Sequence, residues 1–414
     1  MNFFINLDNI FLSSADSFRN IEHNIKFVYE KYNSEKKQYP DNIIVETVAD
    51  LSNFKNFFNF PFQLYHDNKY WVPPFWIEFK DFFKNNNPFW KHAECKLFIA
   101  KRDGKIIGRI AAIIDFTFCE SIGKKIGYFG FFECIETYDC AKALFSSVEE
   151  WLSVKGMSVM RGPINGRIDI SCGLLLDGFN TPPTFLSTYS QPYYIKFCEK
   201  YNMKKSRDFF IYNVDLSKPI PKKLIEDAKN CEKSGIQIRH FDRLHTQREL
   251  RWWIKLFLNT FKGHWGYVPV SDDEVRSRFG VKQLQWVVDK KLFLVAELDK
   301  SPIAYLLATP DYNQVFKNLN GKLGPIQILK FLWSKNYINE GKLHFIGIDN
   351  KYRNKNIGSY LNYSALVEMK NRGYKSAKVG LIDEMNKVAH STISKTNAKI
   401  YKRYRVFDKK LEKS

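Results

Sequence analysis

The sequence lacks several features that would assign it to a class at once. No run of apolar residues approaches the length of about 18 that a membrane-spanning helix requires, so no such helix is expected. The N-terminal stretch has no basic segment and no long apolar core, so it does not fit a secretory signal peptide. The seven cysteines are odd in number and include no CxxC pair, which argues against a disulfide framework and a zinc cluster. We therefore expect a cytoplasmic protein without a metal, and peripheral contact with the inner membrane stays open.

Acidic residues are also few, because 44 Asp and Glu stand against 64 Lys and Arg, for a formal net charge of +20. Such an excess favours an anionic ligand, an anionic membrane surface or a nucleic acid as partner. A genome biased toward Lys, Asn and Ile explains the charge equally well. No dense basic tract and no nucleic-acid module is present, so we expect no nucleic-acid partner.

Aromatic side chains are abundant. Hydrophobic residues make up 44% of the chain and aromatic residues 16%, with 36 Phe and 22 Tyr, and this composition excludes wholesale disorder. The 414 residues are enough for two or three domains with cores of their own. We expect large aromatic cores or an apolar substrate cleft.

Two similar series of strands and helices follow one another, and each consists of a hairpin, a strand, a helix and a further strand. In the first series we expect these elements at residues 96–100, 106–116, 126–135, 139–155 and 157–161. In the second series we expect them at residues 292–298, 303–309, 344–348, 357–372 and 377–383. The first hairpin turns at Asp103–Gly104, a strong hairpin signal. This order predicts an α/β (α+β) fold with mixed sheets flanked by helices, and an internal duplication.

Composition also predicts the domain boundaries. Residues 1–42 are a polar N-terminal appendage, residues 43–215 a first domain and residues 224–414 a second domain. Residues 216–223, which contain two prolines, form the link between them. Within the first domain we expect a short helix at residues 54–60 that Pro61 ends or kinks.

The most informative segment is a short apolar run followed by a basic turn, residues 349–356, and a helix that begins at Ile357. The first N–H groups of a helix are unpaired and lie at the positive end of its dipole, so they suit a phosphate. Arg353 and Lys355 add charge, and Gly358 allows a close approach to the backbone. An ordinary basic loop that caps a helix is the alternative. We interpret the segment as a pyrophosphate site whose details suggest coenzyme A.

This order of elements resembles that of the GNAT acyl-CoA N-acyltransferases, which have a loop of the form Arg/Gln-x-x-Gly-x-Gly/Ala. Here Arg353, Asn356 and Gly358 match it, and Asn in place of the first glycine tolerates a positive φ. The family's Asn-x-x-Ala on the next helix is matched by Asn386 and Ala389. In the family a tyrosine at the position of Ile393 serves as proton donor, and this chain lacks it. The resemblance therefore leaves Tyr404, or Tyr401, to take that role.

Segments along most of residues 65–407 resemble a bacterial subgroup of tandem GNAT-like proteins that includes the bacterial ceramide synthases. They include residues 70–74, 87–93, 108–115, 130–134, 161–165, 173–179, 265–270 and 401–405. The resemblance implies tandem GNAT-like domains and an acyl-CoA co-substrate. The predicted acyl-CoA contacts are Ile348, Arg353, Lys355, Asn356, Ile357, Gly358, Ser359 and Asn386.

Two further residues are catalytic candidates. Glu133 lies in a very aromatic strand, where desolvation would raise its pKa toward that of a useful general base; a buried structural glutamate is the alternative. His264 is a candidate proton shuttle. We interpret the acidic residues 272–274 as a helix cap led by Ser271, and His92 as a packed loop histidine.

Candidate substrate contacts lie in segments rich in Gly and Pro. Asn165, Tyr189 and Tyr193 offer amide and phenol groups there, although turn chemistry alone would explain the composition. No histidine can be paired with Cys134 or Cys172 from spacing, so we expect direct attack on the thioester rather than an acyl-enzyme.

Together these observations predict an N-acyltransferase that moves an acyl group from acyl-CoA to a primary amine, with a long-chain sphingoid base as the favoured acceptor. An amino acid or peptide amine is the first alternative. A GNAT-like pseudoenzyme that binds acyl-CoA or a protein partner is the second, and Asn356 and Ile393 favour it. The first series has no basic glycine loop after residues 126–135, so we expect one cofactor site. The oligomeric state stays open.

Overall fold

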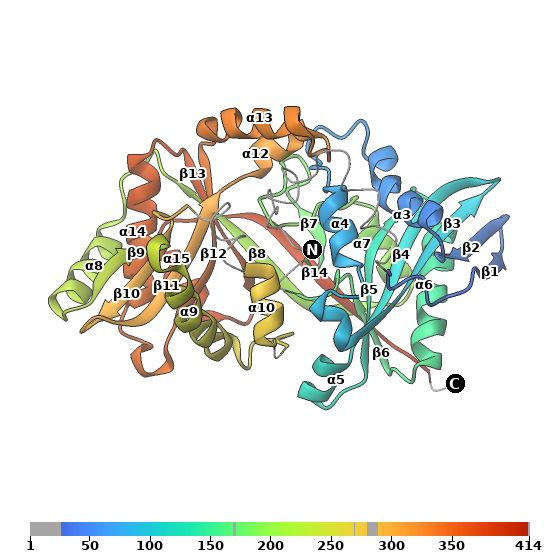
Figure 1. Ribbon diagram of the computed structural model, residues 1–414, viewed down its shortest axis with the longest axis horizontal. Helices are drawn as coiled ribbons and strands as arrows, with labels where there is room; N and C mark the ends of the chain where they lie inside the picture. The colour runs from blue at the N-terminus through green and yellow to red at the C-terminus, as the bar shows by residue number, and fades with distance from the viewer. Residues whose placement is uncertain (1–25, 169–170, 269, 280–288, 413–414) are drawn as a thin grey trace.

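The computed structural model describes residues 26–168, 171–268, 270–279 and 289–412. In these residues one mixed sheet of 14 strands runs the length of the molecule, with helices on both faces (Figure 1). Its strand order is β1-β2-β3-β4-β5-β6-β14-β8-β13-β12-β11-β10-β9, and β7 (Leu174–Asp177) pairs with β14 off this path. The predicted class, α/β with helices around a mixed sheet, is confirmed. None of the described helices combines the length and the apolar character needed to cross a bilayer.

The N-terminal half carries the first predicted series. Its strands are β1 (Lys36–Tyr39), β2 (Ile43–Thr47), β3 (Ala93–Arg102), β4 (Lys105–Asp115), β5 (Ile126–Cys134) and β6 (Val159–Gly162). Asp103 and Gly104 both have positive φ, as a tight hairpin turn requires. Helix α6 (Tyr138–Val154) covers one face, and α3 (Leu51–Leu64) and α4 (Trp76–Phe82) pack an aromatic core on the other. Of the predicted appendage, residues 1–25 lie outside the described residues, and β1 pairs with β2.

The C-terminal half repeats this arrangement. Its strands are β9 (Gln237–His240), β10 (Phe293–Leu298), β11 (Ser301–Pro310), β12 (Glu340–Ile348) and β13 (Ser376–Asp383). Helices α8 (Lys222–Lys233) and α14 (Ile357–Asn371) cover one face, and α9 (Thr246–Phe261) covers the other. The predicted hairpin, strand, helix and strand are all present, with ends that differ by a few residues.

Two long strands at the centre join the halves. β8 (Lys204–Asp215), which precedes the C-terminal half in the chain, pairs with β13, and β14 (Lys399–Lys410), the last strand, pairs with β6. β8 and β14 pair with each other. Read inward from β2 or from β9, the order is four antiparallel strands (β2–β5 or β9–β12), a parallel neighbour and then a strand from the other half of the chain, and β1 adds one more strand outside β2. The two tandem units therefore share one continuous sheet, and each completes the other.

Helix α3 differs from its prediction. The helix continues through Pro61 and ends at Leu64, where we expected Pro61 to end or kink it. Proline has no N–H to donate to the carbonyl four residues earlier, and that carbonyl belongs to Phe57. The guanidinium of Arg109 donates to it from Nη1 at 2.6 Å. A side chain from β4 therefore supplies the hydrogen bond that the proline cannot make.

Candidate active site

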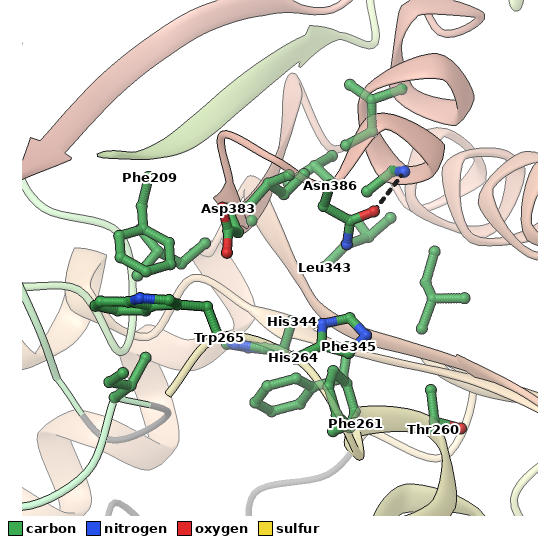
Figure 2. A pocket seen from close by; sticks show the side chains of 18 of the residues that line it. Phe209, Thr260, Phe261, His264, Trp265, Leu343, His344, Phe345, Asp383 and Asn386 are labelled. Carbon is green, nitrogen blue, oxygen red and sulfur yellow. Dashed lines mark hydrogen bonds between the residues drawn. The ribbon is translucent and has the colours of Figure 1, made fainter. Parts of the chain in front are cut away.

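A cleft of about 450 Å³ opens where β12 and β13 separate (Figure 2). The two strands pair in parallel only as far as Leu343 and Val379. Aromatic side chains line much of the cleft: Phe209, Phe257, Phe261, Trp265 and Phe345. The cleft lies between the α14 and α9 layers, and its deep end reaches the segment 186–188 from the N-terminal half.

Irregular backbone on both strands causes this separation. In β12, His344 is the extra residue of a bulge, because Leu343 and Phe345 face consecutive residues of β11. In β13 the register to β8 shifts between Val379 and Ile382. Gly380 lies in this shift with a φ of 132°, and a Cβ there would meet the carbonyl oxygen of Phe210. Beyond Leu343 the edge of β12 that would face β13 therefore has no strand partner among the described residues.

Helix α14 begins beside the cleft with unsatisfied donors. Asn356, at the N-cap, has a φ of 58° and makes no side-chain cap. The first helical hydrogen bond runs from Tyr360 N to Asn356 O at 3.0 Å, and the N–H groups of residues 357–359 have no partner among the described residues. A Cβ on Gly358 would lie 3.5 Å from Ile348 Cδ1, so the glycine keeps the approach to these donors open. Such a helix N-terminus suits an anion.

Four of the predicted acyl-CoA contacts line the cleft, namely Ile348, Arg353, Gly358 and Asn386. The other four, Lys355, Asn356, Ile357 and Ser359, form the adjoining loop and first helical turn. Arg353 lies at the rim, where its Nη2 donates to the carbonyl oxygen of Thr260 at 3.4 Å.

Two buried side chains in the cleft lack hydrogen-bond partners among the described residues. Asn362 lies four residues after Gly358, on the same face of α14, and is only 1% exposed. Both its amide nitrogen and its carbonyl oxygen are unpaired, as is Oγ1 of Thr260. Burying such groups unpaired costs about 1–3 kcal/mol each, so the cleft fits a ligand that carries amide donors and acceptors.

A pair of buried ionisable groups lies at the deep end of the cleft. Lys342, on β12, donates from Nζ to Thr184 Oγ1 at 2.6 Å and to Ser187 Oγ at 3.0 Å. Burial lowers the pKa of this lysine, while the charge of Asp311 opposes the shift. Burial raises the pKa of Asp311, which the charge of Lys342 opposes in turn. The charge of Lys342 also acts on His344, which lies two residues further along β12.

His344 is half-buried in the wall of the cleft. Burial, followed by the positive charge of Lys342, holds the pKa of its imidazole well below the usual range. Its Nε2 lies 2.8 Å from Oγ1 of Thr309, and its ring meets that of Phe185 edge-on at 5.8 Å. A neutral imidazole, fixed by a hydroxyl partner and open to the cleft, is able to accept a proton.

His264 and Tyr404, the other predicted catalytic residues, also line the cleft but at opposite ends. His264 lies near the rim, with its ring 5.3 Å from that of Phe261, and burial together with the charge of Arg353 lowers its pKa. Tyr404 is deep in the cleft and donates its hydroxyl to the carbonyl of Thr188 at 3.1 Å. Burial raises the pKa of Tyr404, so its phenol stays protonated. Asn386 caps the helix α15 (Lys387–Ser394) by accepting from Ala389 N at 3.0 Å (Figure 2).

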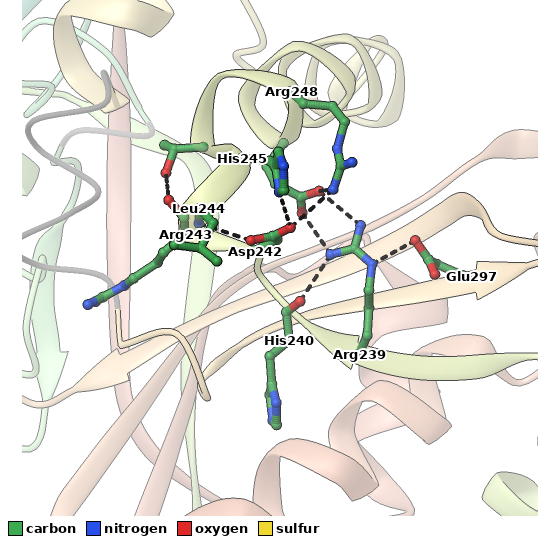
Figure 3. Close-up of polar contacts among 10 residues, drawn as sticks. Arg239, His240, Asp242, Arg243, Leu244, His245, Arg248 and Glu297 are labelled. Atoms are coloured by element: carbon green, nitrogen blue, oxygen red, sulfur yellow. Dashed lines mark hydrogen bonds and ion pairs between the residues drawn. The ribbon is translucent and has the colours of Figure 1, made fainter.

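A network of ions fixes the helix that forms one wall of the cleft (Figure 3). Arg239 on β9 donates from Nε to Glu297 at 2.6 Å and from Nη1 to Glu249, on the first turn of α9, at 2.7 Å. Asp242 caps the preceding turn by accepting from Leu244 N at 2.9 Å. The C-terminal end of α9 is thereby held where Thr260 and the residues after it reach the cleft.

Glu133 lies outside the cleft, in β5 of the N-terminal half. Its Oε2 accepts hydrogen bonds from the hydroxyls of Tyr65 at 2.7 Å and Tyr194 at 2.8 Å. Burial raises its pKa to about 7, and the charge of Arg109 acts against that shift. The direction of this shift agrees with the expectation from its aromatic strand, but the carboxylate belongs to a separate polar cluster.

The three predicted substrate contacts also lie outside the cleft lining. Asn165 accepts from Phe131 N at 2.6 Å, Tyr189 donates to Phe179 O at 2.7 Å, and Tyr193 donates to Cys134 O at 2.8 Å. All three are engaged within the N-terminal half.

Sequence reasoning did not single out Lys342, His344 or Asn362. A signal existed for the first two, because they are polar residues two positions apart in an otherwise apolar strand, and so lie close together. Asn362 has a weaker signal, which is its position four residues after Gly358 on the same helix.

The same region matches a known protein family. Residues 255–395 match the model of the Acetyltransferase (GNAT) family. The chain carries a GNAT acetyltransferase domain. That match spans β10 to β13, α14 and α15, and thus most of the cleft. It supports an acyl-CoA-dependent N-acyltransferase activity for this chain.

Two curated relatives match over most of the chain. It is 28% identical over 378 residues to Protein YghO of Escherichia coli strain K12, which covers 89% of this chain and 95% of that protein. It is 28% identical over 377 residues to the bacterial ceramide synthase of Caulobacter vibrioides, with coverage of 89% and 97%. A solved structure described as a GCN5-related glucosamine N-acetyltransferase region of a fungal multi-domain enzyme matches with a TM-score of 0.50 at 14% identity, covering 90% of this chain and 38% of that chain. The last likeness concerns the fold alone.

Proposed function

We propose that the GNAT protein transfers a long acyl chain from acyl-CoA to the amine of a long-chain sphingoid base. The observation that carries the proposal is the cleft, which joins an unpaired helix N-terminus to an apolar interior. The 28% identity to a bacterial ceramide synthase along most of both chains supports the choice of acceptor.

The residues present fit acyl-CoA at three places. The N–H groups of residues 357–359, with Arg353, are placed to hold the phosphates. Asn362 and Thr260 are placed to pair with the amides of the pantetheine arm, which would satisfy their unpaired atoms. The free edge of β12 after Leu343 leads from this region to the deep end. When bound there, acyl-CoA supplies an acyl group activated as a thioester.

In this proposal His344 takes the proton from the attacking amine. It is neutral, lies at the point where β12 and β13 separate, and is oriented by Thr309. Tyr404, which burial keeps protonated, is the proposed proton donor to the leaving CoA thiolate. His264 lies beside Arg353, so we assign it to the phosphate end of the cleft. His344 lines the cleft and Glu133 does not, which favours His344 over Glu133 as the proton acceptor.

Backbone donors on the free edge of β12, in residues 344–348, are placed to stabilise negative charge on the carbonyl oxygen of the substrate. The aromatic and aliphatic lining favours an apolar chain over a small acyl group. The lining supports a lipid substrate rather than a polar metabolite.

The test is mass spectrometry of products from purified protein supplied with palmitoyl-CoA and a panel of amines that includes sphinganine. We expect N-palmitoyl sphinganine. An amide formed only with amino acids or peptides would replace the acceptor and keep the enzyme class. Bound CoA with no amide from any amine would overturn the proposed reaction.

A further inference from the structure

One helix presents an apolar face to the surface. Helix α13 (Pro325–Ser334) lies at the outer edge of the molecule, above α12 (Asn313–Phe316) in the orientation of Figure 1. Ile326, Leu329, Trp333 and the following Tyr337 are 66%, 67%, 67% and 66% exposed. Their spacing of three and four residues places them along one side of the helix. We call these four side chains the α13 apolar face.

The rest of α13 is fixed to the fold. Ile328 is buried, and Phe331 and Leu332 pack against the same core cluster, which includes Tyr312 and Phe316. The rings of Trp333 and Tyr337 contact each other, with centroids 4.9 Å apart. The exposed side chains are therefore displayed by a packed helix and not by a loose arm.

The charged residues of the segment that carries this face are all of one sign. The 28 residues between Asp311 and Glu340 contain four lysines and no Asp or Glu. The four are Lys317, Lys322, Lys330 and Lys335, and all are exposed. The whole chain has a formal net charge of +20. Apolar side chains with Trp and Tyr, bordered by lysines, form the pattern of a helix that lies in the interface of an anionic membrane.

We infer that the α13 apolar face binds a bilayer that contains anionic phospholipid, with the helix lying in the plane of the membrane. Anionic headgroups would neutralise the four lysines, and Trp333 and Tyr337 suit the level of the headgroups. A second copy of this chain is a poorer occupant, because its own lysines would meet these lysines across the contact.

The position of α13 relative to the cleft gives this surface a function. The core cluster beneath α13 includes Phe185 and Leu186. Leu186 lines the cleft, and Phe185 contacts the ring of His344. The membrane would thus lie on the side of the molecule nearest the deep end of the cleft. Delivery of a lipid amine or acyl chain from the membrane rests on the proposed function, whereas membrane binding itself does not.

The test is flotation of the full-length protein with vesicles of phosphatidylcholine, with and without phosphatidylglycerol. We expect binding to the anionic vesicles that weakens as salt is raised. The double variant Leu329→Glu/Trp333→Glu should lower the bound fraction by at least about tenfold, because it removes buried apolar area and adds repulsion. Val154→Glu is the matched control, since Val154 is 77% exposed at the end of α6 in the N-terminal half, and it should bind as the parent does.

Three outcomes would overturn the inference: no vesicle binding by the parent, equal binding by the double variant, or equal binding to neutral vesicles. Loss of a dimer in the double variant, without any vesicle binding, would assign the face to a second copy instead. Acyl transfer to detergent-solubilised sphinganine is measured alongside. If no form of the protein makes amide but the vesicle result holds, the proposed function fails and the membrane surface remains.

Discussion

The two halves of the molecule contain the same strand geometry and use it differently. In the N-terminal half the parallel pairing of β5 and β6 ends at Tyr128 and Arg161, as that of β12 and β13 ends at Leu343 and Val379. Here, however, Ile164 and Asn165 occupy the gap. Ile164 N donates to Phe129 O at 2.8 Å, and Asn165 accepts from Phe131 N at 2.6 Å.

The helices that follow differ in the same sense. In the N-terminal half, α6 has an acidic residue, Asp139, in its first turn, and its negative charge offsets the positive end of the helix dipole. In the C-terminal half, α14 follows Arg353 and Lys355 and has no acidic residue in its first turn. Separated strands therefore form a binding site only where no side chain fills the gap between them and no acidic residue offsets the charge of the helix N-terminus.

The largest effect should come from His344, the proposed proton acceptor in the C-terminal half. His344→Gln keeps a hydrogen bond to Thr309 but removes the basic imidazole, and we expect kcat to fall about 100- to 10,000-fold. Glu133→Gln, in the corresponding strand of the other half, should change kcat little. Steady-state kinetics with purified variants measures both. A large loss in Glu133→Gln with an active His344→Gln would reverse the assignment.

The pH profile of the parent sharpens the same contrast. Because the pKa of His344 is depressed, kcat/KM should stay level from neutral pH to below the usual histidine range. If Glu133 were the base, the rate would fall below about pH 7, since burial raises its pKa to about 7.

Filling the space beside Gly358, at the start of α14, should remove the anion site that distinguishes the C-terminal half. In Gly358→Val the added methyl groups would crowd Ile348 and Thr392, which lie 3.5 and 3.7 Å from a Cβ at this position. We expect CoA affinity to fall by about 100-fold, or about 2.7 kcal/mol, measured by calorimetry. Gly358→Ala is the graded control and should lose about tenfold or less, because its Cβ makes ordinary contacts. Unchanged affinity in the valine variant would remove the phosphates from this helix.

Emptying the filled gap should affect stability rather than binding. Asn165→Ala leaves the buried N–H of Phe131 without its acceptor, and we expect a loss of about 1–3 kcal/mol in the free energy of unfolding. Denaturant melts measure it, with Asn165→Asp, which keeps an acceptor oxygen, as control. A raised KM for the amine at unchanged stability would instead restore Asn165 as a substrate contact.

The smallest effect concerns the contact between the halves. His92 lies 3.1 Å from Asp115 and 3.2 Å from Glu274 of the C-terminal half. Burial lowers its pKa, but these two carboxylates outweigh burial and raise it to about 9. Because the pKa of His92 is higher in the folded state, its protonated ring stabilises the fold fully below about pH 6.5. This contribution is lost as the pH rises through about 9.

His92→Gln should therefore lower stability by about 1–2 kcal/mol at pH 6 and by less above pH 9. Thermal melts across this range measure the change. His66→Gln is the control, because His66 is exposed beside Asp67. A pH-independent loss would show that His92 acts through packing alone.

The sequence predicted what local signals determine. Asp103–Gly104 fixes a hairpin, and the basic turn before Ile357 fixes the start of α14. The strand exchange of β8 and β14 was not predictable, because apolar alternation does not specify which distant strand is the partner. An aromatic strand showed that Glu133 would be buried, but not that it lies away from the cleft.

Pro61 shows a similar limit. Local rules make it a helix breaker, and only the distant guanidinium of Arg109 explains why α3 continues. Residues whose partners come from far along the chain escape prediction from neighbours alone.

The exchanged strand β14 has a consequence for biosynthesis. It spans Lys399–Lys410 and is made after every other described strand, yet it pairs with Arg161 and Gly162, more than 200 residues earlier in the chain. Until it emerges, β6 and β8 each present an unpaired edge, which is open to association with other nascent chains. The N-terminal half therefore reaches its final structure only after β14 has been made, and a truncation before Lys399 would leave both halves incomplete.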